Sequence, residues 1–252
     1  MSSPSNDQYK RVILVTGSND GIGYELVRLL VEKGHTVYLA SRSVPSGKAA
    51  QAKLKDEYNF DVKLVQLDVT DAASIQAAKD TIEQAEGRLD TLVNNAGVSY
   101  MAEPQGACTV SLDTLRKTFE PNFFGLVQTT QAFVPLLRAA PKGFACILNV
   151  SMALASNTRQ ASPEAALHFA AYNPSKAAMN SYSIILAKDL EAEDIKVNMV
   201  CPGFVTTKLN GHRPGGKTPE DGAKTLIPWA LLGPEDVGKT CLFWGDNGHF
   251  PW

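Results

Sequence analysis

The segment Tyr172-Asn173-Pro174-Ser175-Lys176 places a phenol and an ammonium group four positions apart. On a helix, side chains at this spacing share one face. The chain also contains a glycine-rich run, Thr16-Gly17-Ser18-Asn19-Asp20-Gly21-Ile22-Gly23, between an apolar strand and a helix. Such a turn usually holds the pyrophosphate of a dinucleotide. A proton donor beside a bound nicotinamide indicates hydride transfer to a carbonyl or from an alcohol.

The three glycines of the run follow the spacing G-x3-G-x-G. A side chain at Gly17 or Gly21 would keep the backbone away from the pyrophosphate, and Gly23 lets the helix pack closely on the strand. The helix that starts after Gly21 offers free N–H groups and the positive end of its dipole. Taken alone, the motif could also be a plain structural glycine turn.

The end of the second predicted strand carries Ser41 and Arg42. An enzyme specific for NAD usually has a carboxylate here for the ribose 2′-hydroxyl, whereas a guanidinium can bind a 2′-phosphate. This favours NADP(H) over NAD(H), although Asp20 would repel that phosphate. The Asp68 carboxylate could accept from the adenine amino group while the Val69 N–H completes the contact with the base, and helix capping explains Asp68 equally well.

Free tyrosine has a pKa of about 10 and is a reluctant acid at neutral pH. The ammonium of Lys176, one helical turn away, is expected to favour the phenolate and lower that pKa, and an oxidised nicotinamide would add to the effect. Tyr172 could then donate its proton to a carbonyl oxygen as hydride arrives, or take it back in reverse. The alternative is an ordinary aromatic residue in a helix core.

Apolar runs alternate with longer amphipathic segments along the chain. The pattern predicts strands at 12–15, 36–40, 62–67, 89–94, 144–150 and 195–201. It predicts helices at 22–31, 48–57, 71–86 with Asp71 as its cap, 112–140 with a break near Pro121, and 170–190. This alternation indicates a doubly wound, Rossmann-type α/β fold, with a parallel sheet of seven or six strands between two helix layers.

Ligands bind such sheets past the carboxyl ends of the strands, where nearly every motif of this chain lies. Residues 1–10 are expected to be a flexible N-terminus. Residues 11–252 are expected to form a single dinucleotide-binding catalytic domain. Its loop at about 208–219 is rich in Gly, Pro and charge, so we expect a mobile substrate loop there.

The composition is that of an ordinary globular protein, with 44% apolar and 20% charged residues among 252. A net charge of −2 without a basic run argues against nucleic acid or an anionic membrane as a partner. No apolar segment reaches the ~18 residues of a membrane span, and no signal peptide is visible. The four scattered cysteines indicate reduced thiols and no metal site. We therefore expect a cytoplasmic protein.

Four motifs in order resemble the short-chain dehydrogenase/reductase family. They are the glycine turn, Asn94-Asn95-Ala96-Gly97, Tyr172-x-x-x-Lys176 and Pro202-Gly203-Phe204-Val205-Thr206-Thr207. The Ala40-Ser41-Arg42 turn and the extra residues before Tyr172 resemble the NADPH-dependent carbonyl reductase branch.

The resemblance implies a role for each matching residue. Tyr172 would be the general acid, and Lys176 would bind the nicotinamide ribose. Asn122 would lie at a helix irregularity and hold a water in a proton relay, although a helix N-cap after Pro121 also accounts for it. Asn94 would stabilise the sheet, and Val205 and Thr207 would hold the carboxamide. The expected cofactor contacts are Gly17, Asn19, Asp20, Gly21, Ile22, Gly23, Ser41, Arg42, Asp68, Val69, Asn95, Ala96, Gly97, Lys176, Pro202, Gly203, Val205 and Thr207.

The family's serine is the point where the pattern fails. The family usually has two serines after an Asn-Val pair, and the second binds the substrate oxygen. Here Asn149-Val150 is followed by Ser151 and Met152. A thioether cannot donate a hydrogen bond. Either a local backbone shift brings Ser151 to the substrate oxygen as a fourth catalytic residue, or Met152 fills the serine position.

These observations predict an NAD(P)H-dependent oxidoreductase that reversibly reduces a carbonyl to an alcohol. The segments expected to line the pocket are largely apolar, which favours a small hydrophobic carbonyl or alcohol substrate. The alternative is an NADP(H)-binding scaffold or sensor with weak redox activity, favoured by Met152 alone. Whether the protein is a monomer or a homo-oligomer stays open at this stage.

Overall fold

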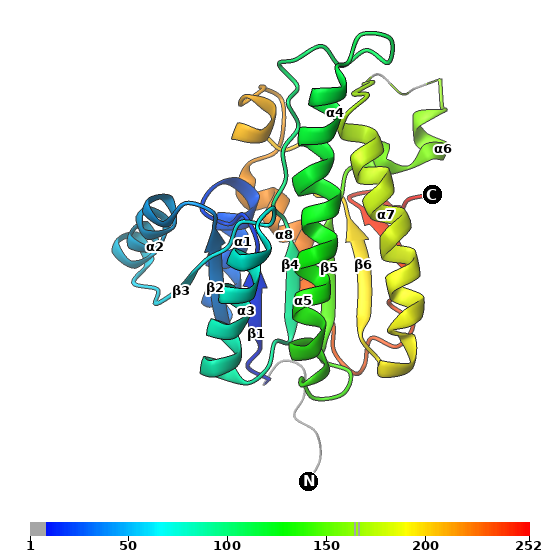
Figure 1. Ribbon diagram of the computed structural model, residues 1–252. Helices are drawn as coiled ribbons and strands as arrows, with labels where there is room; N and C mark the ends of the chain where they lie inside the picture. The colour runs from blue at the N-terminus through cyan, green and yellow to red at the C-terminus, as the bar shows by residue number, and fades with distance from the viewer. Residues whose placement is uncertain (1–8, 164, 166) are drawn as a thin grey trace.

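The computed structural model describes residues 9–163, 165 and 167–252 (Figure 1). Most of the N-terminal segment expected to be flexible, residues 1–8, lies outside this range. One eight-stranded sheet has the order β3-β2-β1-β4-β5-β6-β7-β8, and only β7 and β8 pair antiparallel. Its strands are β1 (Val12–Val15), β2 (Thr36–Ser41), β3 (Lys63–Gln66), β4 (Thr91–Asn94), β5 (Cys146–Val150), β6 (Lys196–Val200), β7 (Leu242–Gly245) and β8 (Gly248–His249).

The helices form two layers, as predicted. They are α1 (Gly21–Glu32), α2 (Val44–Tyr58), α3 (Ala72–Glu86), α4 (Leu112–Phe119), α5 (Leu126–Arg138), α6 (Asn157–Gln160), α7 (Tyr172–Asp189) and α8 (Pro219–Ala230). Helices α3, α5 and α7 lie in front of the sheet in Figure 1, and α1 and α8 lie behind it. No helix in the described part of the chain is both long and apolar enough to cross a bilayer.

The alternation of side chains along β1 explains the two layers. Val12 and Leu14 pack into the core beneath α3, α5 and α7, whereas Ile13 and Val15 pack into the core beneath α1, α2 and α8. A strand buried on both faces is a continuous apolar run, which is why β1 could be predicted from sequence. The doubly wound fold is therefore confirmed, with seven parallel strands and one short antiparallel addition.

The strand order reverses between β1 and β4, because the chain runs outward to β3 and then returns to the centre. This is the switch point of a doubly wound sheet, and its crevice lies outside the carboxyl ends of the strands. Those ends and their loops lie at the top of Figure 1, together with α4 and α6.

The predicted break near Pro121 is a π-helical turn over Glu120–Gly125, which joins α4 to α5. A π turn inserts one extra residue into the helical ladder and often marks a functional position. Gly125 is needed here because a Cβ at this position would lie 2.8 Å from the carbonyl oxygen of Val69. The predicted cap of α3 is also confirmed, since the Asp71 side chain accepts from the N–H of Ala73.

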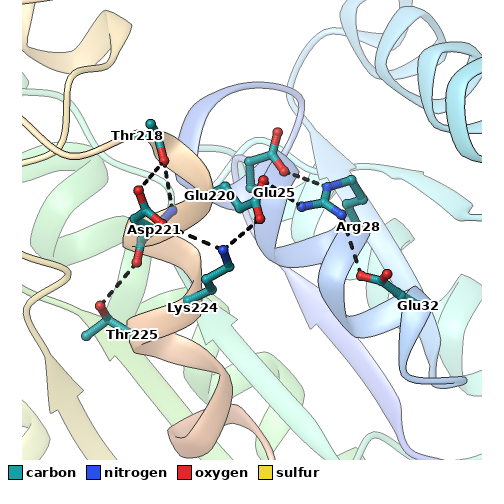
Figure 2. Close-up of polar contacts among 8 residues, drawn as sticks. All are labelled: Glu25, Arg28, Glu32, Thr218, Glu220, Asp221, Lys224 and Thr225. Carbon is teal, nitrogen blue, oxygen red and sulfur yellow. Dashed lines mark hydrogen bonds and ion pairs between the residues drawn. The ribbon is translucent and has the colours of Figure 1, made fainter.

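An ion-pair network joins α1 to α8 (Figure 2). The Arg28 guanidinium is only 7% exposed and lies 2.7 Å from Glu25, 3.5 Å from Glu32 and 3.2 Å from Glu220 of α8. Thr218 caps α8 by accepting from the N–H of Asp221 at 3.1 Å. The network therefore attaches the helix that follows the 208–219 loop to the helix that follows the glycine turn.

The predicted substrate loop is closed at its base. Val205 and Lys217 form a β-bridge, the Thr206 N–H donates to the Lys217 carbonyl at 3.0 Å, and the Lys217 N–H donates to Phe204 at 2.8 Å. A short 3₁₀ turn over Lys208–Asn210 lies inside the loop. The loop ends at Thr218, because α8 begins at Pro219.

Candidate active site

The glycine turn after β1 is packed tightly against the segment after β4. Gly17 has a φ of +60°, and a Cβ on it would lie 2.8 Å from the Cα of Ala96. A Cβ on Gly23 would lie 2.5 Å from the side-chain nitrogen of Asn95. That amide donates to the carbonyls of Thr16 and Gly17 at 2.9 and 3.0 Å. Both glycines are therefore required by the protein's own packing.

The N-terminus of α1 offers hydrogen-bond donors to an anion. Within the described residues, the backbone N–H groups of Ile22 and Gly23 have no hydrogen-bond partner. The N–H of Gly21 is capped by the Asp20 carboxylate at 2.7 Å. A helix N-terminus with free donors fits a pyrophosphate, so the residues present suit a dinucleotide. The Asp20 charge lies at the same place and acts against an additional phosphate.

The predicted adenosine side brings together the ends of β2 and β3. Ser41 is buried, and its hydroxyl donates to the carbonyl of Ser43 at 2.9 Å. Arg42 is exposed and has no ion pair among the described residues, so its guanidinium is available to a phosphate. The Asp68 carboxylate accepts from the N–H and hydroxyl of Thr70 at 2.9 and 2.7 Å. It thus shapes the turn before α3, while Asp71 is the cap.

The predicted nicotinamide side follows β6. Pro202 and Gly203 turn the chain, with Gly203 at a φ of +84°. Thr207 is buried, and a Cβ on Gly21 would lie 3.6 Å from its methyl group. The fold therefore brings the Val205–Thr207 segment over the glycine turn. Asn19 and Ile22 in that turn are half-buried, and Val69 packs directly against Gly125 of the π turn.

Tyr172 and Lys176 occupy the first turn of α7 and are 6% and 4% exposed. The Lys176 ammonium donates to the carbonyl of Val150 at 2.9 Å, and burial lowers its pKa to about 8. Burial also raises the pKa of Tyr172 well above its ordinary value, with a smaller contribution from Cys201. The expectation that Lys176 lowers this pKa is therefore wrong for this structure. Loss of solvation is the largest cause of the shift.

Asn122 lies in the π turn and holds the loop after β4. Its side-chain oxygen accepts from the N–H of Val98 at 2.8 Å, and its nitrogen donates to the Val98 carbonyl at 2.8 Å. The nitrogen also donates to the Ser175 hydroxyl on α7 at 3.0 Å. A Cβ on Gly97 would lie 3.0 Å from the Asn122 oxygen and 3.6 Å from the Lys176 nitrogen. The structure thus brings these residues together, and Asn122 does not cap a helix.

Ser151 and Met152, the two candidates for the serine position, lie in different environments. The Ser151 hydroxyl is buried and donates to the side-chain oxygen of Asn180 on α7 at 2.8 Å. Met152 packs against an apolar cluster that includes Cys201, Phe243 and Phe250. In this conformation the Ser151 proton is directed toward α7, and Met152 offers only an apolar surface.

Two residues outside every motif also join the crevice. The Ser99 hydroxyl, after β4, donates to the carbonyl of Leu209 at 2.5 Å and so links the two sides of the crevice. Gln105 contacts the N-terminus of α7. Neither residue carries a sequence signal, because Ser and Gln are common in polar loops. Among the described residues, no group of three His, Cys, Asp or Glu side chains could hold a metal ion.

The chain is similar to proteins of one known family. The family model for short chain dehydrogenases matches residues 11–216. Carbonyl reductase [NADPH] 1 of Mus musculus is 30% identical, with 96% of this chain and 98% of that protein covered. (−)-Isopiperitenone reductase of Mentha piperita is 29% identical, with 94% and 96% covered. The structure of NADPH-bound carbonyl reductase from chicken fatty liver superposes with a TM-score of 0.83 at 25% identity, covering 96% and 99%. The chain belongs to the short-chain dehydrogenase family.

Proposed function

We propose that this protein is an NADPH-dependent reductase that converts a small hydrophobic ketone or aldehyde to an alcohol, and that it catalyses the reverse reaction as well. The single observation that carries the proposal is the buried Tyr172–Lys176 pair at the carboxyl ends of the central strands, beside a glycine turn that fits a dinucleotide. The reduced nicotinamide, when bound, supplies the hydride that reaches the carbonyl carbon.

Tyr172 is the proton donor in this proposal. The phenol is protonated at neutral pH, and burial, which raises its pKa, further favours this form. Donation of the proton to the carbonyl oxygen therefore depends on a neighbouring positive charge to stabilise the phenolate that is left. Lys176, with a pKa of about 8, is mostly in its protonated, charged form at neutral pH. Its ammonium is positioned by the Val150 carbonyl, from which it can reach a ribose hydroxyl, and it stabilises charge that develops on the phenol oxygen.

The proposed preference for NADPH rests on Arg42. Its exposed guanidinium follows β2, where a 2′-phosphate would lie, and Ser41 presents no carboxylate there. The mouse and chicken relatives are both carbonyl reductases named for NADPH.

The proposed substrate class rests on the apolar surface of the crevice. In this proposal Met152, rather than a hydroxyl, follows Ser151 at the serine position, and the segments proposed to line the crevice expose the hydrophobic side chains of Tyr100, Leu167 and Leu209. The peppermint relative is named as a reductase of isopiperitenone, a small ketone. These observations favour an enzyme over a cofactor-binding scaffold, because Tyr172 and Lys176 are retained and the relatives are named as reductases.

The test is consumption of NADPH, followed by absorbance, with a panel of aliphatic, cyclic and aromatic ketones and aldehydes. We expect turnover with hydrophobic carbonyls and formation of the matching alcohols, and we expect NADP⁺ reduction when those alcohols are supplied. NADH under the same conditions is expected to give a lower kcat/KM. Tight NADPH binding without turnover of any carbonyl would instead support the scaffold alternative.

A further inference from the structure

Helix α7 begins at Tyr172 without a capping side chain of its own. The residue before it is Ala171, whose side chain has no group that can accept a hydrogen bond from the first turn. The first N–H groups of any helix need partners from outside the helix. Whatever supplies them at α7 also fixes the position of Tyr172, because the phenol is carried by the first helical residue.

Gln105 binds the two N–H groups that lead into this first turn, from 66 positions before Ala171, and the Phe169 carbonyl accepts from the N–H of Asn173 at 2.9 Å. Its side-chain oxygen accepts from the N–H of Ala171 at 3.1 Å, and its backbone carbonyl accepts from the N–H of Ala170 at 2.9 Å. Its side-chain nitrogen donates to the carbonyl of Tyr100 at 3.0 Å. The side chain is only 9% exposed, so these bonds lie where water competes little. One amide thus joins the start of α7 to the loop after β4.

The loop after β4, which Gln105 contacts, contains an unfavourable backbone conformation. Tyr100 has a φ of +47°, in the left-handed region that non-glycine residues seldom adopt. Its ring lies under the Lys117 ammonium at 4.7 Å, and its carbonyl also accepts from the N–H of Glu103 at 2.9 Å. The preceding residue, Ser99, bonds to Leu209 across the crevice. Gln105 therefore holds a strained turn that faces the other wall of the site.

We propose that Gln105 is a positioning residue, which caps α7 from outside the helix and holds the Ser99–Tyr100 turn against it. It thereby keeps the phenol of Tyr172 at the distance that proton donation requires. The role rests on the proposed carbonyl reductase function. In this proposal Gln105 has no part in holding the cofactor, because its partners are Ser99, Tyr100, Ala170 and Ala171.

The test compares Gln105→Leu with Gln105→Glu and with a matched control. Leu removes the side-chain bonds to Ser99, Tyr100 and Ala171. Glu keeps the acceptor for Ala171, and its charge suits a helix N-terminus, but it cannot donate to Tyr100. The control is Gln51→Leu in α2, where the amide likewise donates to a backbone carbonyl, that of Val62 at 2.6 Å. Each variant is measured for single-turnover NADPH oxidation, NADPH Kd and melting temperature.

We expect Gln105→Leu to slow the single turnover by about 10- to 100-fold, since a small misplacement of a reacting group can cost that much. The NADPH Kd of this variant is expected to change less than about twofold. The single-turnover rate of Gln105→Glu is expected to fall between the rates of Gln105→Leu and the unchanged protein. The rate of Gln51→Leu is expected to match that of the unchanged protein. A normal rate for Gln105→Leu, a parallel loss of NADPH affinity, or a Glu variant no faster than Leu would overturn the proposal.

A second readout separates this proposal from the proposed function. Amide hydrogen exchange at Ala171 is expected to accelerate in Gln105→Leu and to stay unchanged in Gln51→Leu. If the unchanged protein reduced no carbonyl, the proposed function would fail while the exchange result still tested the cap. Equal protection of the Ala171 amide in both variants would refute the cap itself.

Discussion

Tyr172 and Lys176 lie in the same buried turn, and burial shifts their pKa values in opposite directions. Each shift favours the uncharged form, upward for the phenol and downward to about 8 for the ammonium. Spacing in the sequence shows that the two groups share a helix face, but it does not show how much water reaches them. The pair was therefore predictable, and the direction of the Tyr172 shift was not.

The buried charge of Lys176 gives a prediction about stability. Its pKa falls from an ordinary 10.5 to about 8, which corresponds to roughly 3 kcal/mol at most. Between these values the folded protein binds fewer protons than the unfolded chain, so stability should rise with pH across this window. Below about pH 8 the full cost is present. Lys176→Met is therefore expected to stabilise the fold at pH 7, with a gain that shrinks by pH 10.

The measurement is the free energy of unfolding in urea at both pH values. Lys188→Met is the control, because Lys188 is an exposed residue of the same helix and, among the residues that the structure describes, pairs with Glu191 alone. It is expected to change stability by less than about 0.5 kcal/mol. A Lys176→Met protein that is equally destabilised at pH 7 and pH 10 would contradict a charge penalty.

Arg42 and Asp20 are predicted to act on the 2′-phosphate with opposite signs. Arg42→Ala should raise the KM for NADPH about 10- to 100-fold and leave the KM for NADH nearly unchanged, since a charge-assisted bond is worth about 1.5–3 kcal/mol. Asp20→Asn keeps a side chain that can cap Gly21 and removes the negative charge, so the KM for NADPH should fall. Equal effects of either change on both cofactors would refute the assignment.

At the scale of elements, the π turn and α7 are locked together. Asn122 reaches both Val98 and the Ser175 hydroxyl, and that hydroxyl donates to the Tyr172 carbonyl at 2.8 Å. The sequence predicts an interruption at Pro121, because proline lacks the N–H of a regular helix. It does not distinguish a break from a π turn, since the choice depends on how closely Gly125 approaches Val69 across the interface.

The α1–α8 network in Figure 2 gives a prediction for these two helices. Arg28→Met should keep the aliphatic packing and leave Glu25, Glu32 and Glu220 without their shared cation. We expect a loss of about 1–3 kcal/mol, between the values for exposed and buried pairs, because Arg28 is buried and two of its partners are half-exposed. The free energy of unfolding in urea measures it.

The control for this change is Lys79→Met in α3, whose ion pairs with Asp80 and Glu83 involve exposed carboxylates. Its effect is expected to stay below about 0.5 kcal/mol. If the two substitutions cost the same, the Arg28 network would contribute no more than a surface pair.

At the scale of the whole molecule, periodicity predicted β1 through β6 and the longer helices between them, but not the four-residue helix α6, because buried parallel strands are short apolar runs. The last part of the fold was missed for physical reasons. Helix α8 contains Gly222 and Pro228, both poor helix formers, and β7 and β8 are only four and two residues long. Their pairing depends on β6 being already in place.

The candidate site also has a part that the sequence predicts and a part that it does not. Motif residues lie where the topology requires, since the loops after β1, β4 and β6 meet at one edge of the sheet. Gln105 and Ser99 could not be found from sequence, because their roles come from contacts with residues 66 and 110 positions away.

The central claim is that Tyr172 donates the proton to the carbonyl oxygen and that other residues bind the cofactor. The most direct measurement is single-turnover NADPH oxidation by Tyr172→Phe with a carbonyl that the unchanged protein reduces, alongside NADPH Kd. Tyr182→Phe, the same change on the same helix, is the control. The account predicts a loss of at least about 10²-fold for Tyr172→Phe with an unchanged Kd, and a normal rate for Tyr182→Phe. Undiminished hydride transfer by Tyr172→Phe would contradict it.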